Sequence, residues 1–373
     1  MDQITARKLQ QVGKAFNLPG PFFSYEEILN GNVNRTYIVN YISDDGTGMA
    51  VVKPYLVQKI NSYAFRNPDQ LMSNIDKVTE FIRSKRPNET CMHFHHTSVS
   101  GERKTYLEED DSFWRIYKYI PAITFDKCDD VNIIRSAGKA FGDFQTVLSD
   151  FDVSQLYYTI PDFHNTIKRY ETLIADAEKD PFGRVAEVRE ELDYLLSVKE
   201  EACRITAMYN EGRLPLRVTH NDTKINNVLF DEQTYEPLVV IDLDTVMPGL
   251  VAHDFGDAIR FAANFTEEDS VNTEKTGVDL NVFWAFADGF LSQTAQTLTE
   301  DEVNTLALSC FSITCELATR FLDDYIIGDK YFKVKRDKHN LIRTRCQIAL
   351  AKDMQTKLDA MDAIVKSCVK KYK

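Results

Sequence analysis

Two patterns of apolar residues divide this chain of 373 residues. The first third alternates short apolar segments with turn residues, which predicts strands at residues 25–29, 36–39, 55–60, 104–107 and 113–120. Helical spacing occurs twice in this third, over residues 4–16 and 67–83. From residue 129 onward apolar positions recur at helical spacing, most clearly over 129–148, 182–209, the stretch after 282 and 347–369. The patterns predict an α+β protein with a mostly antiparallel sheet first and a larger helical part after it.

A chain of this length is too long for one ordinary hydrophobic core and suits two domains. We place the boundary near Pro121, which gives a smaller domain of residues 1–120 and a larger one of residues 121–373. Asn67 and Pro68 form an N-cap and first-turn pair that predicts the start of the helix in the smaller domain. In the larger domain, Gly138 and Gly142 are four residues apart, which indicates close contact between helices rather than a ligand site.

Polar residues with a chemical role gather in one segment. Asp222 and Asn227 are five residues apart on a loop, and the next apolar strand ends at Asp242. Phosphoryl transfer needs a carboxylate to hold and deprotonate the attacking hydroxyl, and an amide oxygen with a second carboxylate to hold magnesium against the phosphates. A hairpin can bring these three groups together, so the sequence predicts Asp222 as the base and the other two as magnesium ligands. A solvated polar turn is the alternative, and the order and spacing of all three groups make it the weaker one.

The surrounding blocks carry a wider resemblance. They read Thr-His-Asn-Asp-Thr-Lys at 219–224, Asn-Asn at 226–227, Ile-Asp-Leu-Asp-Thr at 241–245, Met-Pro-Gly at 247–249 and Asp-Phe-Gly-Asp at 254–257. They resemble the aminoglycoside-phosphotransferase and choline-kinase group, which shares the two-lobed protein-kinase-like fold. Within that group the closer resemblance is to the N-acetylhexosamine 1-kinases, and further blocks at 114–115, 141–145, 320–322 and 339–341 extend it over nearly the whole chain.

The resemblance implies a kinase that uses ATP and Mg²⁺ to phosphorylate the anomeric C1 hydroxyl of N-acetylglucosamine or N-acetylgalactosamine. The smaller domain would bind the nucleotide, and the larger would bind the sugar and carry the catalytic residue. Two alternatives stay open. One is a kinase of another sugar, an amino alcohol or an aminoglycoside. The other is a catalytically silent nucleotide-binding protein, against which the intact set of Asp222, Asn227 and Asp242 argues.

Kinases of this fold pair the phosphates with a lysine on a strand of the small lobe. The resemblance places Gln58 at that position, although neighbouring strand residues face opposite sides and Lys59 in the other register would also fit. Tyr119 and Ile120 should lie near the adenine, where the chain passes from one lobe to the other. Simple hydrophobic lining would explain these two residues as well.

The resemblance also implies contacts with the substrate. Asn32 lies at a hairpin tip where several relatives carry histidine, and Asp244 is expected to touch a second metal or a substrate hydroxyl. Arg320 and Tyr331 are expected to contact the sugar, because arginine can donate paired hydrogen bonds to hydroxyl and N-acetyl oxygens. A solvated charged helix face is an equal alternative for the residues at helical spacing, which are Glu316, Arg320, Asp324 and Tyr325.

Asp254 and Asp257 stand in a block with the letters of the kinase Asp-Phe-Gly motif, but this block follows Asp242, which already fills the metal position. We therefore expect Asp254 or Asp257 to hydrogen-bond the backbone of the loop that carries Asp222.

Composition narrows the possible partners. The net charge of −13 argues against nucleic acid or an anionic membrane as the main partner. The seven cysteines form no Cys-x-x-Cys pair, the start has no signal-like core, and we expect no apolar run of membrane-spanning length. These features favour a cytoplasmic protein with reduced thiols. His93 and His95 share a strand face but lack partners at zinc spacing, so half-buried strand histidines are favoured over a metal site.

Overall fold

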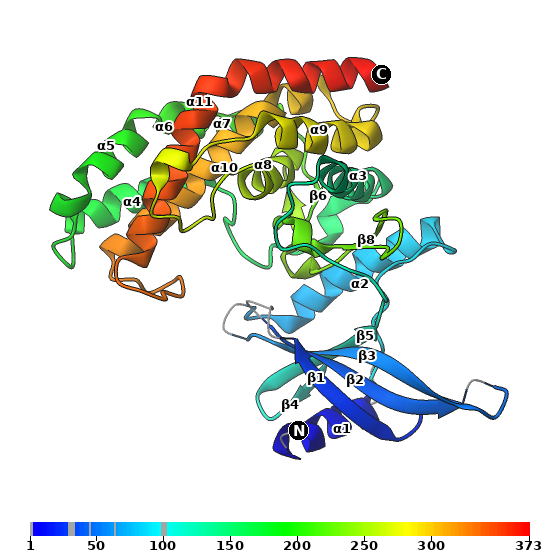
Figure 1. The fold of residues 1–373 in the computed structure, drawn as a ribbon. Helices are drawn as coiled ribbons and strands as arrows, with labels where there is room; N and C mark the ends of the chain where they lie inside the picture. Colours follow the sequence, from blue (N-terminus) through cyan, green and yellow to red (C-terminus); the bar gives the residue numbers. More distant parts are fainter. Residues whose placement is uncertain (1–2, 29–33, 45, 63–64, 98–102) are drawn as a thin grey trace. The chain divides into compact units, whose positions relative to one another are not determined.

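The computed structural model describes residues 3–28, 34–44, 46–62, 65–97 and 103–373 (Figure 1). The chain divides into two compact units, one of Met1–Ala122 with Gln155–Ile160 and one of Ile123–Ser154 with Pro161–Lys373. The first contains an antiparallel sheet and the second is larger and mainly helical. The predicted α+β class and the order of its two parts are therefore confirmed.

A five-stranded antiparallel sheet dominates the first unit. Across the sheet its strands are β1 (Phe22–Ile28), β2 (Arg35–Asp44), β3 (Ala50–Ile60), β5 (Ser112–Lys118) and β4 (Leu107–Glu109). The predicted hairpin is confirmed, because β1 and β2 pair with Ile28 opposite Thr36. Asn32, at the tip of this hairpin, lies outside the described residues. Helix α1 (Gln3–Ala15) covers one face of the sheet, where Leu9 and Val12 join the buried side chains of β2, β3 and β5.

Helix α2 (Pro68–Lys85) begins where the sequence predicts. The side chain of Asn67 accepts a hydrogen bond from the Gln70 N–H at 3.1 Å, and Pro68 occupies the first turn. On the buried side of α2, the Asn74 amide bonds both the carbonyl and the N–H of Tyr157 at 2.8 Å. This pair of bonds fastens Gln155–Ile160 to the first unit, a crossing of the chain that the periodicity did not indicate.

The second unit consists of helices and two short pairs of antiparallel strands. The helices are α3 (Val131–Val147), α4 (Thr166–Lys179), α5 (Arg189–Ser197), α6 (Lys199–Ala202), α7 (Arg204–Asn210), α8 (Val251–Ala262), α9 (Leu280–Thr294), α10 (Glu300–Ile326) and α11 (His339–Tyr372). The antiparallel pairs are β6 (Arg217–Thr219) with β9 (Met247–Gly249), and β7 (Val228–Phe230) with β8 (Pro237–Val240). Short 3-10 turns occupy Val153–Gln155, Val185–Val188, Ile225–Asn227, Leu243–Thr245 and Thr273–Lys275. In Figure 1, α11 runs over α9 and α10, against which it packs.

Helices α3 and α9 approach each other so closely that only glycine fits between them. A Cβ on Gly138 would lie 2.3 Å from the Phe286 carbonyl oxygen, and one on Gly142 would lie 2.5 Å from that of Phe290. The prediction that these glycines mark a helix contact is confirmed.

The single long helix expected over residues 182–209 is wrong. The segment is a 3-10 turn followed by α5, α6 and α7, with breaks at Val198 and Cys203. Both break residues have ψ close to 0° and make short-range backbone bonds, so the regular helix is interrupted and the chain bends there. All three short helices pack against α10, and the bends keep the segment on that helix.

Helix α10 is a core element of the second unit. It packs against α4, α8 and α11, and the Thr299–Glu302 capping box closes its N-terminus. Among the described residues it is the one helix that is long and apolar enough to cross a membrane, which the sequence expectation missed. In its most apolar window, 83% is buried inside the protein, so the helix core explains its composition.

Candidate functional site

The loop between β6 and β7 brings two of the predicted site residues together. The Asn227 side-chain amide donates to the backbone oxygen of Asp222 at 2.8 Å and to its Oδ2 at 3.2 Å. On the other side of this carboxylate, Lys224 Nζ lies 2.8 Å from Asp222 Oδ1. The Asp222 side chain is therefore held from two sides while it stays partly open to solvent.

The β7–β8 hairpin brings the third residue beside them. Val228 pairs with Val240, and the next backbone bond runs from the Ile241 N–H to the Asn227 oxygen at 2.9 Å. Asp242 follows at φ 58°, a left-handed conformation that turns the chain out of the strand and leaves the residue exposed. The hairpin thus brings the backbone of Asp242 to within one residue of the position bonded to Asn227.

The buried ring of His220 fixes the start of the loop. Its ring is fully buried against Phe141 and Phe144, with ring centroids 5.7 and 6.1 Å away. The Asp222 N–H donates to Nδ1 at 3.3 Å, so the other ring nitrogen carries the proton and donates to the Ile241 carbonyl at 2.8 Å. The ring thus links the backbone of Asp222 to the strand end before Asp242.

Asp254 holds the backbone of the same loop. Its carboxylate accepts the backbone N–H of His220 at 2.9 Å and of Asn221 at 2.7 Å, and Gln145 donates to it at 2.8 Å. The expectation that Asp254 or Asp257 bonds this backbone is confirmed for Asp254, which lies in the first turn of α8 and not in a loop. Burial raises the pKa of Asp254 and the N–H donors oppose that rise.

A row of alternating charges leads from Asp222 into the helical core. Its members are Asp222, Lys224, Asp257, Arg260 and Glu268. Arg260 donates from two nitrogens to Asp257 at 3.0 and 2.9 Å, and a third nitrogen pairs with Glu268 at 2.8 Å. Burial favours the neutral acid at Asp257, but the charges of Arg260 and Lys224 outweigh it and lower the pKa of that carboxyl. Burial also works against the charge of Lys224, and the carboxylates of Asp222 and Asp257 overcome it, so the pKa of this lysine is raised.

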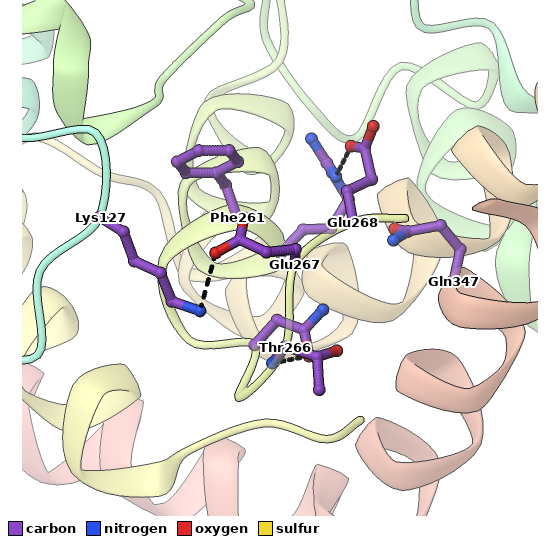
Figure 2. A pocket seen from close by; sticks show the side chains of 8 residues that line it. Lys127, Phe261, Thr266, Glu267, Glu268 and Gln347 are labelled. Atoms are coloured by element: carbon purple, nitrogen blue, oxygen red, sulfur yellow. Dashed lines mark hydrogen bonds and ion pairs between the residues drawn. The ribbon is translucent and has the colours of Figure 1, made fainter. Parts of the chain in front are cut away.

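A small pocket opens at the far end of this row. Figure 2 shows Glu268 in its ion pair and Lys127 paired with Glu267, while Gln347 reaches in from α11. The pocket is lined by Lys127, Arg260, Phe261, Asn264, Thr266, Glu267, Glu268 and Gln347. No residue predicted for the nucleotide or the substrate lines it.

Arg320 and Tyr331 do lie together. The Arg320 guanidinium carbon is 5.8 Å from the centroid of the Tyr331 ring and 5.4 Å from those of Phe163 and Phe332. Arg320 is half-buried and Tyr331 is exposed. Burial, and then the charge of Arg320, lower the pKa of the nearby Arg169. Within the part of the chain that the structure describes, no carboxylate lies within ion-pair distance of Arg320 or Arg169.

The helix that carries Arg320 is not a solvated charged face. Glu316 and Asp324 are 1% and 2% exposed, so the burial of α10 overturns that alternative. Glu316 accepts from His164 Nδ1 at 2.9 Å and from the Thr166 hydroxyl at 2.7 Å. The His164 ring lies 4.9 Å from that of His253, which precedes Asp254 in α8. The first turn of α8 therefore connects the two regions. Its His253 lies near His164 and Glu316 beside Arg320, and its Asp254 bonds to the loop that carries Asp222.

In the first unit, Gln58 and Lys59 lie on opposite faces of β3. Gln58 donates to Thr36 at 2.9 Å and accepts from Arg115 at 2.8 Å, and Arg115 reaches Met72 of α2. Lys59 lies over the Trp114 ring at 5.8 Å, on the face that α1 covers. Gln58 is thus the residue on the α2 side of the sheet.

The remaining predicted residues are placed as follows. Tyr119 and Ile120 follow β5 and are half-buried, and Asp244 is buried in the 3-10 turn after Asp242. Among the described residues, no group of three or more His, Cys, Asp or Glu could hold a metal ion. Lys224 was not among the residues predicted for the site, although its spacing of two residues from Asp222 on a short loop was a usable signal.

Comparison with known proteins identifies the family. A family model described as the phosphotransferase enzyme family matches residues 25–278. The chain belongs to this family.

Solved structures share its fold. An aminoglycoside phosphotransferase from Alicyclobacillus acidocaldarius superposes with a TM-score of 0.63 at 13% identity, covering 96% of each chain. An ethanolamine kinase from Plasmodium vivax gives 0.58 at 14% identity, with 93% of this chain and 89% of that one covered. A spectinomycin phosphotransferase in complex with ADP and spectinomycin gives 0.57 at 12% identity, covering 93% of this chain and 98% of that one. At these identities the likeness shows the fold alone, which is the protein-kinase-like fold.

Proposed function

We propose that this phosphotransferase moves the γ-phosphoryl group of Mg-ATP to the anomeric C1 hydroxyl of an N-acetylhexosamine. The observation that carries the proposal is the convergence of Asp222, Asn227 and Asp242 at one loop and hairpin. That set combines a carboxylate for the attacking hydroxyl with two oxygen donors for a metal, which is the requirement of phosphoryl transfer.

Asp222 is the residue proposed to accept the proton of the sugar hydroxyl. Its Oδ1 pairs with Lys224 and its Oδ2 with Asn227, so the carboxylate cannot rotate freely away from an incoming hydroxyl. Asp254 holds the backbone just before it, and the His220 ring accepts the Asp222 N–H. Phosphoryl transfer depends on positioning more than on covalent help, so this restraint supports catalysis directly.

Asn227 and Asp242 fit a magnesium ion by the chemistry of their donors. Mg²⁺ takes oxygen ligands and commonly uses one or two carboxylates together with phosphates and waters. The nitrogen of the Asn227 amide is bonded to Asp222, which directs its oxygen to the other side of the amide group. When bound there, the ion would offset phosphate charge during transfer.

The charge around Arg320 disfavours a cationic substrate. Two guanidinium groups, Arg320 and Arg169, lie near one another beside Phe163 and Tyr331. Such a surface repels the cations of aminoglycosides and amino alcohols, whereas it can donate hydrogen bonds to the hydroxyl and N-acetyl oxygens of a sugar. Arg320 and Tyr331 are therefore proposed to bind the sugar, with Asn32 and Asp244 as further contacts.

For the nucleotide, we propose Gln58 on the α2 face of the sheet and Tyr119 with Ile120 beside the adenine. The buried guanidinium of Arg115, bonded to Gln58, leaves a positive charge on the face where a lysine would be expected. The missing lysine alone therefore does not favour the silent nucleotide-binding alternative, and the set of Asp222, Asn227 and Asp242 argues against it.

Initial rates of ADP release separate the candidates. With Mg-ATP, we expect turnover of N-acetylglucosamine and N-acetylgalactosamine, slower turnover of glucosamine and galactosamine, and none with ethanolamine or spectinomycin. An Asp222→Asn protein should lose turnover by about 10²–10⁴-fold, the usual contribution of a general base. Faster turnover of ethanolamine or spectinomycin than of any sugar would refute the sugar assignment and leave the family intact.

A further inference from the structure

Asp324, near the end of α10, is bonded to the loop that follows the helix. Its carboxylate accepts the backbone N–H groups of Lys330 at 2.8 Å, Tyr331 at 2.7 Å and Phe332 at 2.9 Å. The residue is 2% exposed, and no cation among the described residues lies within ion-pair distance of it. Backbone donors therefore satisfy much of a buried negative charge, as in a backbone anion site.

The same loop is fastened from two other directions. Asn340 in α11 donates to Asp324 Oδ2 and to Asp329 Oδ1, both at 2.8 Å. Arg184 donates from one nitrogen to Asp329 and to the Tyr325 carbonyl, both at 2.7 Å. The chain leaves α10 through Gly328 at φ 92° and Asp329 at φ 57°, so the turn is tight and Asp324 lies at its centre.

The loop carries the aromatic residues Tyr331 and Phe332 of the proposed sugar site. Tyr331 and Phe332, whose N–H groups Asp324 holds, place their rings 5.8 and 5.4 Å from the Arg320 guanidinium. Arg320 lies one helical turn before Asp324 on α10. One helix thus supplies both the cation and the carboxylate that holds the aromatic rings against it.

We propose that Asp324 is a positioning residue for substrate specificity, which acts by holding Tyr331 and Phe332 against Arg320. This inference rests on the proposed function of the Arg320 site. The carboxylate is required because each group bonded to it is an N–H donor. An asparagine there would offer one acceptor oxygen and would turn its own NH₂ toward a backbone donor.

The test is steady-state kinetics of Asp324→Asn with N-acetylglucosamine and Mg-ATP. We expect KM for the sugar to rise about tenfold or more, the equivalent of one lost charged hydrogen bond, while KM for ATP and kcat stay within about threefold. The matched control is Asp323→Asn. It removes the same charge one residue away, from a carboxylate that makes none of these bonds, and should leave KM for the sugar unchanged.

Hydrogen exchange gives a readout without turnover. The amides of residues 330–332 should exchange faster in Asp324→Asn than in the wild type or in Asp323→Asn. Unchanged exchange would overturn the inference, and so would faster exchange with an unchanged KM for the sugar. A wild-type protein that turns over no N-acetyl sugar would instead refute the proposed function. If Asp324→Asn does not fold, Asn340→Ala removes one donor from the same carboxylate, and an unchanged KM in that variant overturns the inference.

Discussion

At the residue scale, acids that look solvent-facing in the sequence turn out to organise the helical unit from within. Asp254, Glu316 and Asp324 are each at most 2% exposed, and each is satisfied by specific donors. A buried carboxylate that loses its partners is costly, whereas one that keeps them fixes the groups around it. These acids therefore fix the positions of the loops that carry the candidate site.

Asp254→Asn tests this role at the Asp222 loop. The carboxylate accepts two backbone N–H groups and the Gln145 amide, and an asparagine nitrogen would face one of these donors. We expect kcat to fall by about 10–100-fold, equivalent to the roughly 1.5–3 kcal/mol of a hydrogen bond to a charged group. Asp231→Asn is the control. It lies in an exposed hairpin turn whose two N–H bonds asparagine can also accept, and it should keep full activity.

His253 predicts a pH dependence of stability. Burial, and then the charge of His164, lower the pKa of His253 to about 3, while the charge of Glu316 opposes the shift. The unfolded chain takes up a proton at about pH 6.5, so the neutral ring stabilises the fold fully above that pH and progressively less as pH falls toward 3.

The measurement is the free energy of unfolding from pH 7 to 4 for the wild type and for His253→Phe. The wild type should lose up to about 1.4 kcal/mol more per pH unit below 6.5 than the variant does, the slope for one proton. Parallel curves would show that His253 is not held neutral by burial.

At the element scale, the contact between α3 and α9 makes the sharpest prediction. Alanine at Gly142 gains helix propensity of about 1 kcal/mol, but its Cβ would lie 2.5 Å from the Phe290 carbonyl oxygen, and overpacking costs about 1–3 kcal/mol. We expect Gly142→Ala to lower the apparent Tm by several degrees. Ser136→Ala in the same helix gains propensity without that clash, and a similar loss in both variants would contradict the packing argument.

Elements with local signals could be predicted from the sequence. The Asn67 cap of α2, the β1–β2 hairpin and the β7–β8 hairpin all follow from residues close in the chain. The breaks at Val198 and Cys203 could not be predicted, because they depend on packing against α10 and leave the apolar periodicity intact. The same holds for Lys224 and Asp257, whose interaction joins two distant segments.

At the scale of the whole molecule, the chain crosses back to the first unit after α3. Asn74 makes this crossing specific through two bonds to Tyr157, 83 positions away. Hydrophobic periodicity carries no information on such a bond, so this crossing is absent from the predicted domain of residues 121–373.

Asn74→Ala should loosen this crossing. The change removes both bonds from a side chain that is 1% exposed, at a cost of about 1–3 kcal/mol. The amides of Gln155–Ile160 should then exchange faster with solvent, while Asn132→Ala on the exposed face of α3 leaves them unchanged. Equal protection in both variants would mean that other contacts hold the segment.

The most direct test of the central claim is phosphorus NMR of the product formed from Mg-ATP and N-acetylglucosamine. We predict a new signal coupled to the anomeric proton, which places the phosphate on C1, and its absence with Asp222→Asn under the same conditions. A phosphate on another hydroxyl would contradict the assigned acceptor. Phosphate on C1 at an undiminished rate with Asp222→Asn would contradict the assigned base, and no transfer to any sugar by the wild type would contradict the proposed function.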